Sequence, residues 1–155
     1  MPSSIKLTKK ITGMKIVTPE ETQPEREVLH ERMERPEKLS GTTYKIKPPT
    51  SEHAMYITIN DVVLNEGTPH ETRHPYEMLI HSKNTEQFQW VSALARLISA
   101  VFRKGGDISF LVDELKHVFD PKGGYFKKRQ MIPSEVAEIG MMIEQHLAGL
   151  KPDSH

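Results

Sequence analysis

The chain has 155 residues, 36% of them hydrophobic and 27% charged, a composition typical of one globular domain with a modest core rather than of a chain disordered throughout. Lys and Arg number 21, as do Asp and Glu, so net charge provides no general attraction to nucleic acid or to membranes, and no apolar run is long enough to cross a bilayer. The sequence has no cysteine, which excludes disulfides, thiolate zinc sites, iron–sulfur clusters and any thiol chemistry by this chain.

Residues 1–40 differ from the rest of the chain in composition and in the pattern of apolar residues. The run Met14–Val17 has the character of a weak strand, and a charged, proline-bracketed stretch follows it. Within that stretch, residues 25–34 place Val28, Leu29 and Met33 on one side of about two helical turns, but isolated helices that short are marginal in water. We expect residues 1–40 to form a flexible charged arm that orders on a partner. A solvated tail is the plainer alternative, and composition does not separate the two.

Three strands are expected from alternating apolar residues between positions 41 and 80. The first is Thr42–Lys47, the second Ala54–Asn60 and the third Tyr76–Ile80. The inward-facing sets, one strand after another, are Tyr44 and Ile46, then Met55, Ile57 and Ile59, then Tyr76, Met78 and Ile80. Short connections between consecutive strands favour an antiparallel meander.

After Ser82 the apolar spacing changes to three and four residues, which predicts helices. The first is expected to run from a cap at Asn84 or Thr85 to Lys104, with Gly105 ending it. Asp107 is expected to cap the second, which ends before Pro121. The third starts near Pro133, with Ser134 in its first turn. The predicted fold is therefore α+β: a three-stranded antiparallel sheet followed by three helices packed on one face, organised as an arm (1–40), a compact domain (41–149) and a tail (150–155).

Four residues invite a metal hypothesis: His70, Glu71, His74 and His81. The first three fall in a proline-flanked loop rather than on a helix face, and structural sites usually include thiolates, so we interpret them as exposed loop residues and predict no metal site. For acid–base chemistry the acids Asp61, Glu77, Asp113 and Glu114 are present, but nothing in their spacing pairs them and no Ser–His–Asp arrangement is visible.

The run Gly123–Arg129 (GGYFKKR) is the most suggestive local motif. A glycine pair lets a backbone approach an anion, aromatic rings stack on bases, and adjacent cations meet phosphates. The run is not a P-loop, whose spacing it lacks. The candidate phosphate- or nucleotide-binding residues are Arg103, Lys122, Gly123, Gly124, Tyr125, Lys127, Lys128 and Arg129. A solvated helix–loop surface is the plainer alternative.

Six stretches, taken in order, resemble the C-terminal region of adenosylcobalamin-dependent (class II) ribonucleotide reductases, which includes the so-called TSCPD domain: ERPEKLSGTTYKIK, HAMYITIND, PYEMLIHSKN, FQWVSALARLISAVFRKGGD, FLVDELKHVFDPKGGYF and IPSEVAEIG. They span roughly residues 35–147, and the likeness is greatest to the separately encoded C-terminal piece of split enzymes. Reductases of this kind use a thiyl radical and a redox-active cysteine pair, for which this chain has no residue. No catalytic residue carries over.

The resemblance implies a non-catalytic accessory domain of the ribonucleotide reductase system, which makes DNA precursors. Such a domain docks on a catalytic chain or binds nucleotide or nucleic acid. Two alternatives remain: a free-standing nucleotide- or nucleic-acid-binding module, and a regulator that mimics the reductase tail. We expect the chain to bind no cofactor itself, with adenosylcobalamin only on a separate catalytic chain. We also expect no membrane partner and, since the start MPSSIKLTKKITG lacks the apolar part of a secretory signal, a cytoplasmic location.

Overall fold

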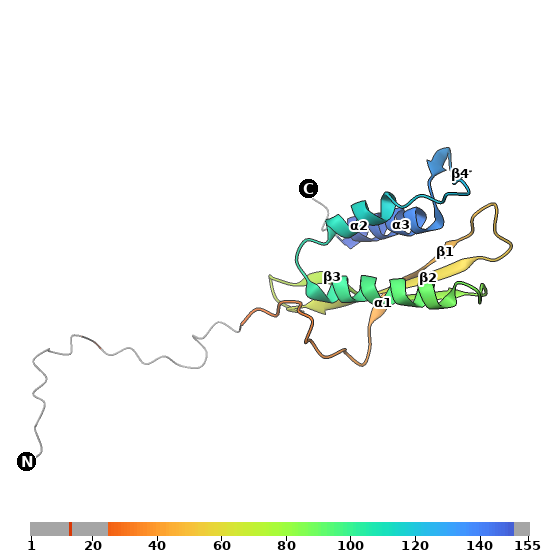
Figure 1. Cartoon of the computed structure of the whole chain (residues 1–155). Coiled ribbons are helices and arrows are strands. Elements are labelled where there is room, and N and C mark those ends of the chain that lie inside the picture. The colour runs from red at the N-terminus through yellow and green to blue at the C-terminus, as the bar shows by residue number, and fades with distance from the viewer. Residues whose placement is uncertain (1–12, 14–24, 151–155) are drawn as a thin grey trace, which may run out of the picture.

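The fold is a three-stranded antiparallel sheet, in the order β1-β2-β3, with its helices on one face (Figure 1). The computed structural model describes residue 13 and residues 25–150. Its elements are β1 (Ser40–Ile46), β2 (Met55–Leu64), β3 (Thr72–Ser82), α1 (Phe88–Lys104), α2 (Ser109–Lys116), β4 (Tyr125–Lys127), β5 (Gln130–Ile132) and α3 (Glu135–Leu150). The predicted α+β class, sheet and three helices are confirmed, whereas the strand expected at residues 14–17 lies outside the described residues. The small hairpin β4–β5, inserted between α2 and α3, was not predicted.

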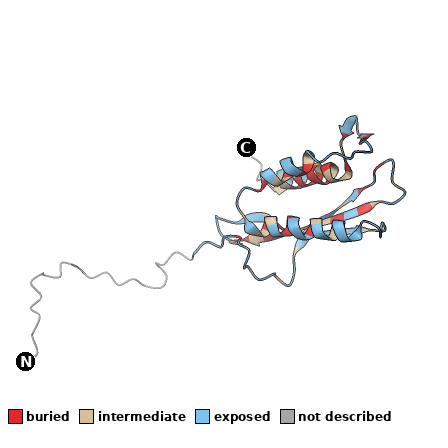
Figure 2. Cartoon of the chain, in the orientation of Figure 1, coloured by how far each residue is buried: buried red, intermediate tan, exposed pale blue. Residues whose placement is uncertain are grey.

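The main core lies between the sheet and the helices. Apolar side chains of β2 and β3 meet those of α1, α2 and α3, and exposed residues cover the outer side of α1 (Figure 2). The most deeply buried members of this cluster are Ile57, Ile59, Met78, Ile98, Phe102, Ile139 and Ile143. Within the helical layer, α1 packs along β3 and α2 packs along α3.

A β-bulge divides the sheet into two ends. Asn60 pairs with Glu77, but the next residue of β2, Asp61, pairs with Pro75, so Tyr76 is an extra residue in β3. The expectation that Tyr76 shares a face with Met78 and Ile80 is therefore wrong, because the extra residue breaks the alternation. Both strands also continue past the ends of the alternating runs, to Leu64 in β2 and from Thr72 in β3.

Residues 25–39 pack on the second face of the sheet, beyond the bulge. Leu29, which is 5% exposed, joins Val62, Leu64 and Tyr76 in a second core cluster. The Tyr76 hydroxyl donates a hydrogen bond to the Met33 carbonyl over 3.1 Å. These residues were expected to lie in the flexible arm, with helical turns at 25–34; in the structure they form an irregular segment with a single turn. The contacts that hold the segment are to the sheet and come from positions more than 30 residues away.

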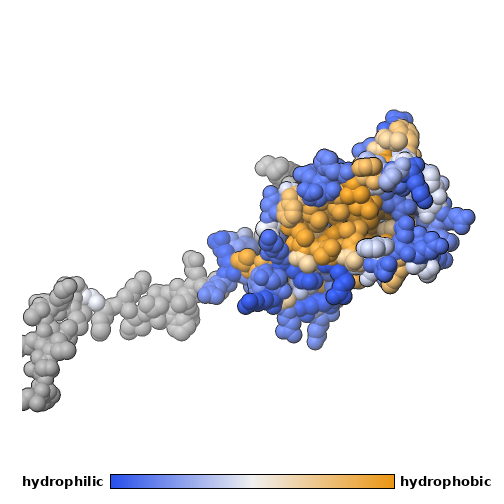
Figure 3. Space-filling model, in the orientation of Figure 1, coloured by the Kyte–Doolittle hydropathy of each residue, from blue (hydrophilic) through white to orange (hydrophobic). Residues whose placement is uncertain are grey.

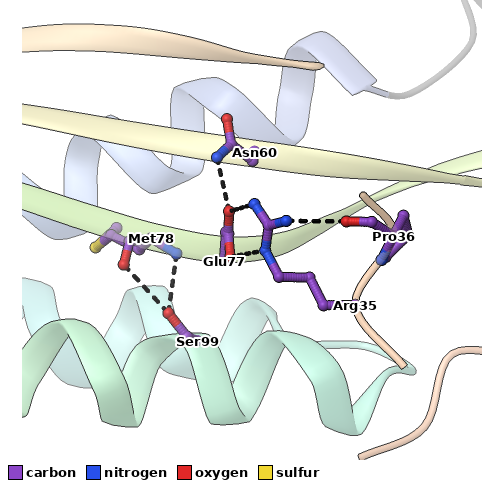
Figure 4. A network of polar contacts seen from close by, with 6 residues as sticks. All are labelled: Arg35, Pro36, Asn60, Glu77, Met78 and Ser99. Carbon is purple, nitrogen blue, oxygen red and sulfur yellow. Dashed lines mark hydrogen bonds and ion pairs between the residues drawn. The ribbon is translucent and has the colours of Figure 1, made fainter. Parts of the chain in front are cut away.

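Polar contacts fix this segment and helix α1 to β3 (Figure 4). The guanidinium of Arg35 binds both carboxylate oxygens of Glu77, at 2.9 and 2.7 Å, and Asn60 donates to the same carboxylate. On α1, the buried Ser99 hydroxyl accepts a hydrogen bond from the Met78 N–H over 2.9 Å and donates to the Ala95 carbonyl. Because β3 is an edge strand, backbone groups that face away from β2 need such partners.

The helix ends differ from the expected ones by a few residues. Helix α1 begins at Phe88, since Asn84 instead accepts a hydrogen bond from the Glu86 N–H in a preceding turn. Asp107 accepts one from the Ser109 N–H at the start of α2. Ser134 lies before α3 and caps it by accepting a bond from the Ala137 N–H over 3.0 Å. None of the helices in residues 25–150 combines the length and apolar character that crossing a membrane demands.

Candidate functional site

The predicted basic loop forms the hairpin β4–β5. Tyr125 pairs with Ile132, Phe126 with Met131 and Lys127 with Gln130, which leaves Lys128 and Arg129 as a two-residue turn. Both turn residues have positive φ, 49° and 62°. Two consecutive residues in this region make a type I′ turn, the tight turn whose usual residues are Asn and Gly. Lys and Arg hold it at an energetic cost, and it projects their side chains from the tip of the hairpin.

The base of the hairpin is fixed to α3 through Glu138. The carboxylate of Glu138 accepts hydrogen bonds from the Tyr125 hydroxyl and from the Lys127 ammonium, the second over 2.5 Å. Burial, followed by the bond to Glu138, raises the pKa of Tyr125, which keeps its hydroxyl protonated as a donor. Burial also raises the pKa of the neighbouring Glu135. The ammonium of Lys127 is thus held in an ion pair with Glu138.

Both glycines of the motif have a structural reason to be there. Gly123 has a φ of 101°, a conformation that other residues rarely adopt. A Cβ on Gly124 would lie 2.0 Å from the Ile132 carbonyl oxygen, so only glycine permits this close approach of β5. The two glycines thus allow the backbone to turn into strand β4 and to pack closely against β5.

The exposed surface of the hairpin combines cations and apolar side chains. Lys122, Lys128 and Arg129 are exposed, and so is the cross-strand pair of Phe126 (66%) and Met131 (64%). The eighth candidate, Arg103, is not part of this surface: it lies in the last turn of α1. The pKa of Glu77 is lowered mainly by its hydrogen bonds with Arg35, and the charge of Arg103 adds to this effect. The structure thus places Lys128 and Arg129 together at the tip of the hairpin, near the exposed ring of Phe126. Lys122 lies before the base of the hairpin, and Arg103 belongs to α1.

A buried chain of hydrogen bonds joins three elements on the helical side of the sheet. His146 of α3 contacts the Asp61 carboxylate through Nε2 at 2.8 Å and the Tyr44 hydroxyl through Nδ1 at 2.8 Å. The side chains of His146 and Asp61 are 4% and 5% exposed. Burial, and then the charge of Asp61, raises the pKa of Tyr44. Sequence spacing could not show this contact, because the partners lie 85 and 102 positions apart.

The hydrogen bonds among Tyr44, His146 and Asp61 can pass a proton between these groups, but the three side chains do not face a substrate-accessible cavity. None of Tyr44, Asp61 and His146 lines the large groove that lies beside α3. The geometry is that of a polar tie between α3 and strands β1 and β2 rather than of a general-base site, which needs access to substrate.

The histidine-rich stretch divides between a loop and a strand. His74, expected in the loop, belongs to β3, where it contacts the Thr72 hydroxyl at 3.0 Å and where burial lowers its pKa. His70 lies in the loop and contacts Arg26 at 3.0 Å. Within residue 13 and residues 25–150, no three His, Asp or Glu side chains group as metal ligands would.

Comparison with known proteins identifies one family. The family model described as the TSCPD domain matches residues 22–147. This range includes all the described strands and helices except the last turn of α3. No curated protein and no solved structure matches the chain.

Proposed function

The chain belongs to the TSCPD domain family, and on this basis we propose that it is a non-catalytic accessory domain of adenosylcobalamin-dependent ribonucleotide reduction, akin to the C-terminal piece of a split enzyme. The observation that carries the proposal is the family match over most of the chain, combined with the complete absence of cysteine from the 155 residues. The family is associated with class II reductases, whose chemistry passes through cysteines. A member without them acts on the reaction by binding.

The proposed mode of action is docking on a catalytic chain that carries the cofactor and the thiols. The hairpin β4–β5 suits this role, since an exposed Phe126–Met131 pair beside exposed cations resembles the apolar and charged mixture of protein interfaces. Its anchorage to α3 through Glu138 presents these groups in one fixed arrangement.

Co-purification and activity test the proposal. Tagged protein recovered from its native cell should bring with it a class II reductase catalytic chain, and adding the purified protein to that chain should raise deoxyribonucleotide formation. A fall in formation supports the alternative of a regulator that mimics the reductase tail. Recovery of no reductase chain, together with unchanged activity, contradicts both.

A second candidate function is the binding of a nucleotide or a single-stranded nucleic acid. The specific observation in its favour is the hairpin tip, where Lys128 and Arg129 stand beside the exposed ring of Phe126. Cations that meet phosphates and a ring that stacks on bases are the elements of sequence-tolerant binding to single strands.

The variant K128N/R129G tests this second candidate. It removes both charges and installs the usual residues of the turn, so the hairpin is retained. Binding of a fluorescent oligonucleotide should weaken, and its dependence on salt concentration should become less steep. The matched control K45Q/K83Q removes two exposed lysines elsewhere and should leave binding unchanged. Equal affinity of K128N/R129G and the unaltered chain argues against the hairpin as a binding site.

A further inference from the structure

A large groove opens at the end of the sheet beyond the bulge. Its walls come from β2 and β3, from the connection between α1 and α2, and from the last turns of α3, and its volume is about 1080 Å³. Much of its floor is apolar: Leu29, Val63, Phe102, Ile108, Val112 and Leu147. Apolar side chains also gather on the surface between α1 and the pair α2 and α3, the helices from which several of these residues come (Figure 3). The volume is at the upper limit of small-molecule pockets, about 300–1,000 Å³, which suits a peptide segment.

The rim of the groove is acidic. Five exposed carboxylates line it: Glu66, Glu71, Asp107, Asp113 and Glu144. Arg73 is the one Lys or Arg among the lining residues that the structure describes, and burial lowers the pKa of the lining His74, which favours its neutral form. Glu144 is paired with Lys116 at 2.7 Å. This balance of charge disfavours a nucleotide or any other phosphate and favours an occupant that is apolar and cationic.

The chain itself contains such a segment. Residues 5–17, IKLTKKITGMKIV, have four lysines, six large apolar residues and no acid. The whole chain balances 21 Lys and Arg against 21 Asp and Glu, so these four lysines leave the remainder with four more acidic than basic residues. Apart from Gly13 the segment lies outside the described residues.

The described chain begins at the edge of the groove. Glu27 and Asn65 hold each other by three hydrogen bonds: the Glu27 N–H to Asn65 Oδ1 at 2.8 Å, and the Asn65 N–H and side-chain amide to Glu27 at 3.1 Å each. Asn65 is next to the rim residue Glu66, and Leu29 itself lines the groove. Val17 and Leu29 are 12 positions apart, and an extended chain of that length spans at most about 40 Å. The basic segment is thus tethered beside an acidic, apolar groove.

We propose that residues 5–17 of this chain occupy the acidic groove of the same molecule, with the lysines against the rim carboxylates and the apolar residues over the floor. The inference does not depend on the accessory role proposed above. It assigns to the groove an internal ligand that a basic, apolar segment of another protein would have to displace.

The absence of cysteine allows a direct test on the full chain, because Thr8→Cys creates one unique thiol for a nitroxide spin label. In methyl-labelled protein, the NMR signals of Ile108, Val112 and Leu147 should lose most of their intensity to the nearby label. Methyl signals of Leu79, which does not line the groove, serve as the internal reference. The same labelled chain carrying K6E/K9E/K10E/K15E should recover the groove signals, and an unchanged melting temperature shows that the domain still folds.

Three results overturn the proposal. Groove signals that keep their intensity in the labelled chain show that the segment lies elsewhere. Broadening that survives reversal of the lysines removes the charge argument. Broadening that appears when spin-labelled chain without methyl labels is mixed with methyl-labelled chain without a spin label assigns the groove to the segment of a second copy.

Discussion

At the scale of single residues, substitutions in the hydrogen-bonded group of Tyr44, His146 and Asp61 should lower the free energy of unfolding most. A buried carboxylate is tolerated only when it is paired, and His146 is the partner that the structure provides for Asp61. The imidazole also accepts or donates at Tyr44, so one side chain satisfies two elements of the sheet. The packing of α3 therefore depends on a polar residue within an apolar helix face.

The variant His146→Leu should lower the free energy of unfolding by about 3–5 kcal/mol, because it leaves the Asp61 carboxylate buried without a partner. Tyr44→Phe, which removes only a half-buried hydroxyl, should cost about 0.5–1.5 kcal/mol. Urea unfolding at neutral pH measures both. Since a buried pair is often replaceable by apolar residues, the double variant Asp61→Leu/His146→Leu should be less damaging than His146→Leu alone. Equal losses for His146→Leu and Tyr44→Phe would contradict a buried ion-pair-like contact.

The pairing of Arg35 with Glu77 predicts a dependence of stability on pH. The hydrogen bonds from Arg35 are the main cause that lowers the pKa of Glu77 below its ordinary value of 4.5. A lowered folded-state pKa adds stability above the unfolded-state value, and that stability is lost as the pH falls through the folded-state value. We expect the unfolding free energy to decrease below about pH 4.5, and to decrease less steeply in Arg35→Met. Arg32→Met, in the same exposed segment, should keep the steeper profile of the unaltered chain in denaturant titrations.

At the scale of elements, the hairpin β4–β5 holds a turn for which its residues are poorly suited. Replacing Lys128 and Arg129 by Asn and Gly relieves two left-handed residues and should raise the unfolding free energy by about 1–2 kcal/mol. Thermal unfolding measures the gain. A gain in stability that accompanies a loss of oligonucleotide or partner binding would identify the two cations as retained for function. A variant less stable than the unaltered chain would show that the turn is not the strained one described.

The elements that the sequence predicted correctly are those with a clear apolar period. Alternation located all three strands of the sheet, and three- and four-residue spacing located all three helices, because each buries one face against the same core. The bulge at Tyr76 was hidden, since one extra residue resembles a break in the pattern. The hairpin was missed as well: its strands have three residues each, too short for a period, and its turn lacks the usual Asn–Gly signal.

At the scale of the whole molecule, the second core makes residues 25–39 part of the folded unit. Leu29→Ala should lower the unfolding free energy by about 2–5 kcal/mol, because the cavity opens between the segment, β2 and β3. Its neighbour Val28, which is 69% exposed, is the matched control, and Val28→Ala should be nearly neutral. Chemical denaturation of both variants checks this. Similar small effects would mean that the segment contributes little to the fold.

The parts of the candidate sites that escaped prediction are those assembled from distant positions. His146 meets Asp61, Glu138 holds Lys127, and five carboxylates from separate elements ring one groove. Periodicity describes only the face that a residue occupies within its own element. Which residues of other elements it meets depends on the packing, and here on a bulge that changes the faces of β3 at Tyr76.

The two faces of strand β2 have a consequence for how the molecule unfolds. Strand β2 contributes Ile57 and Ile59 to the core under the helices and Val62 and Leu64 to the core behind the sheet, so one continuous backbone runs through both. A substitution that destabilises one core therefore also destabilises the other through β2. We expect the two cores to unfold together in a single cooperative transition rather than as separate layers.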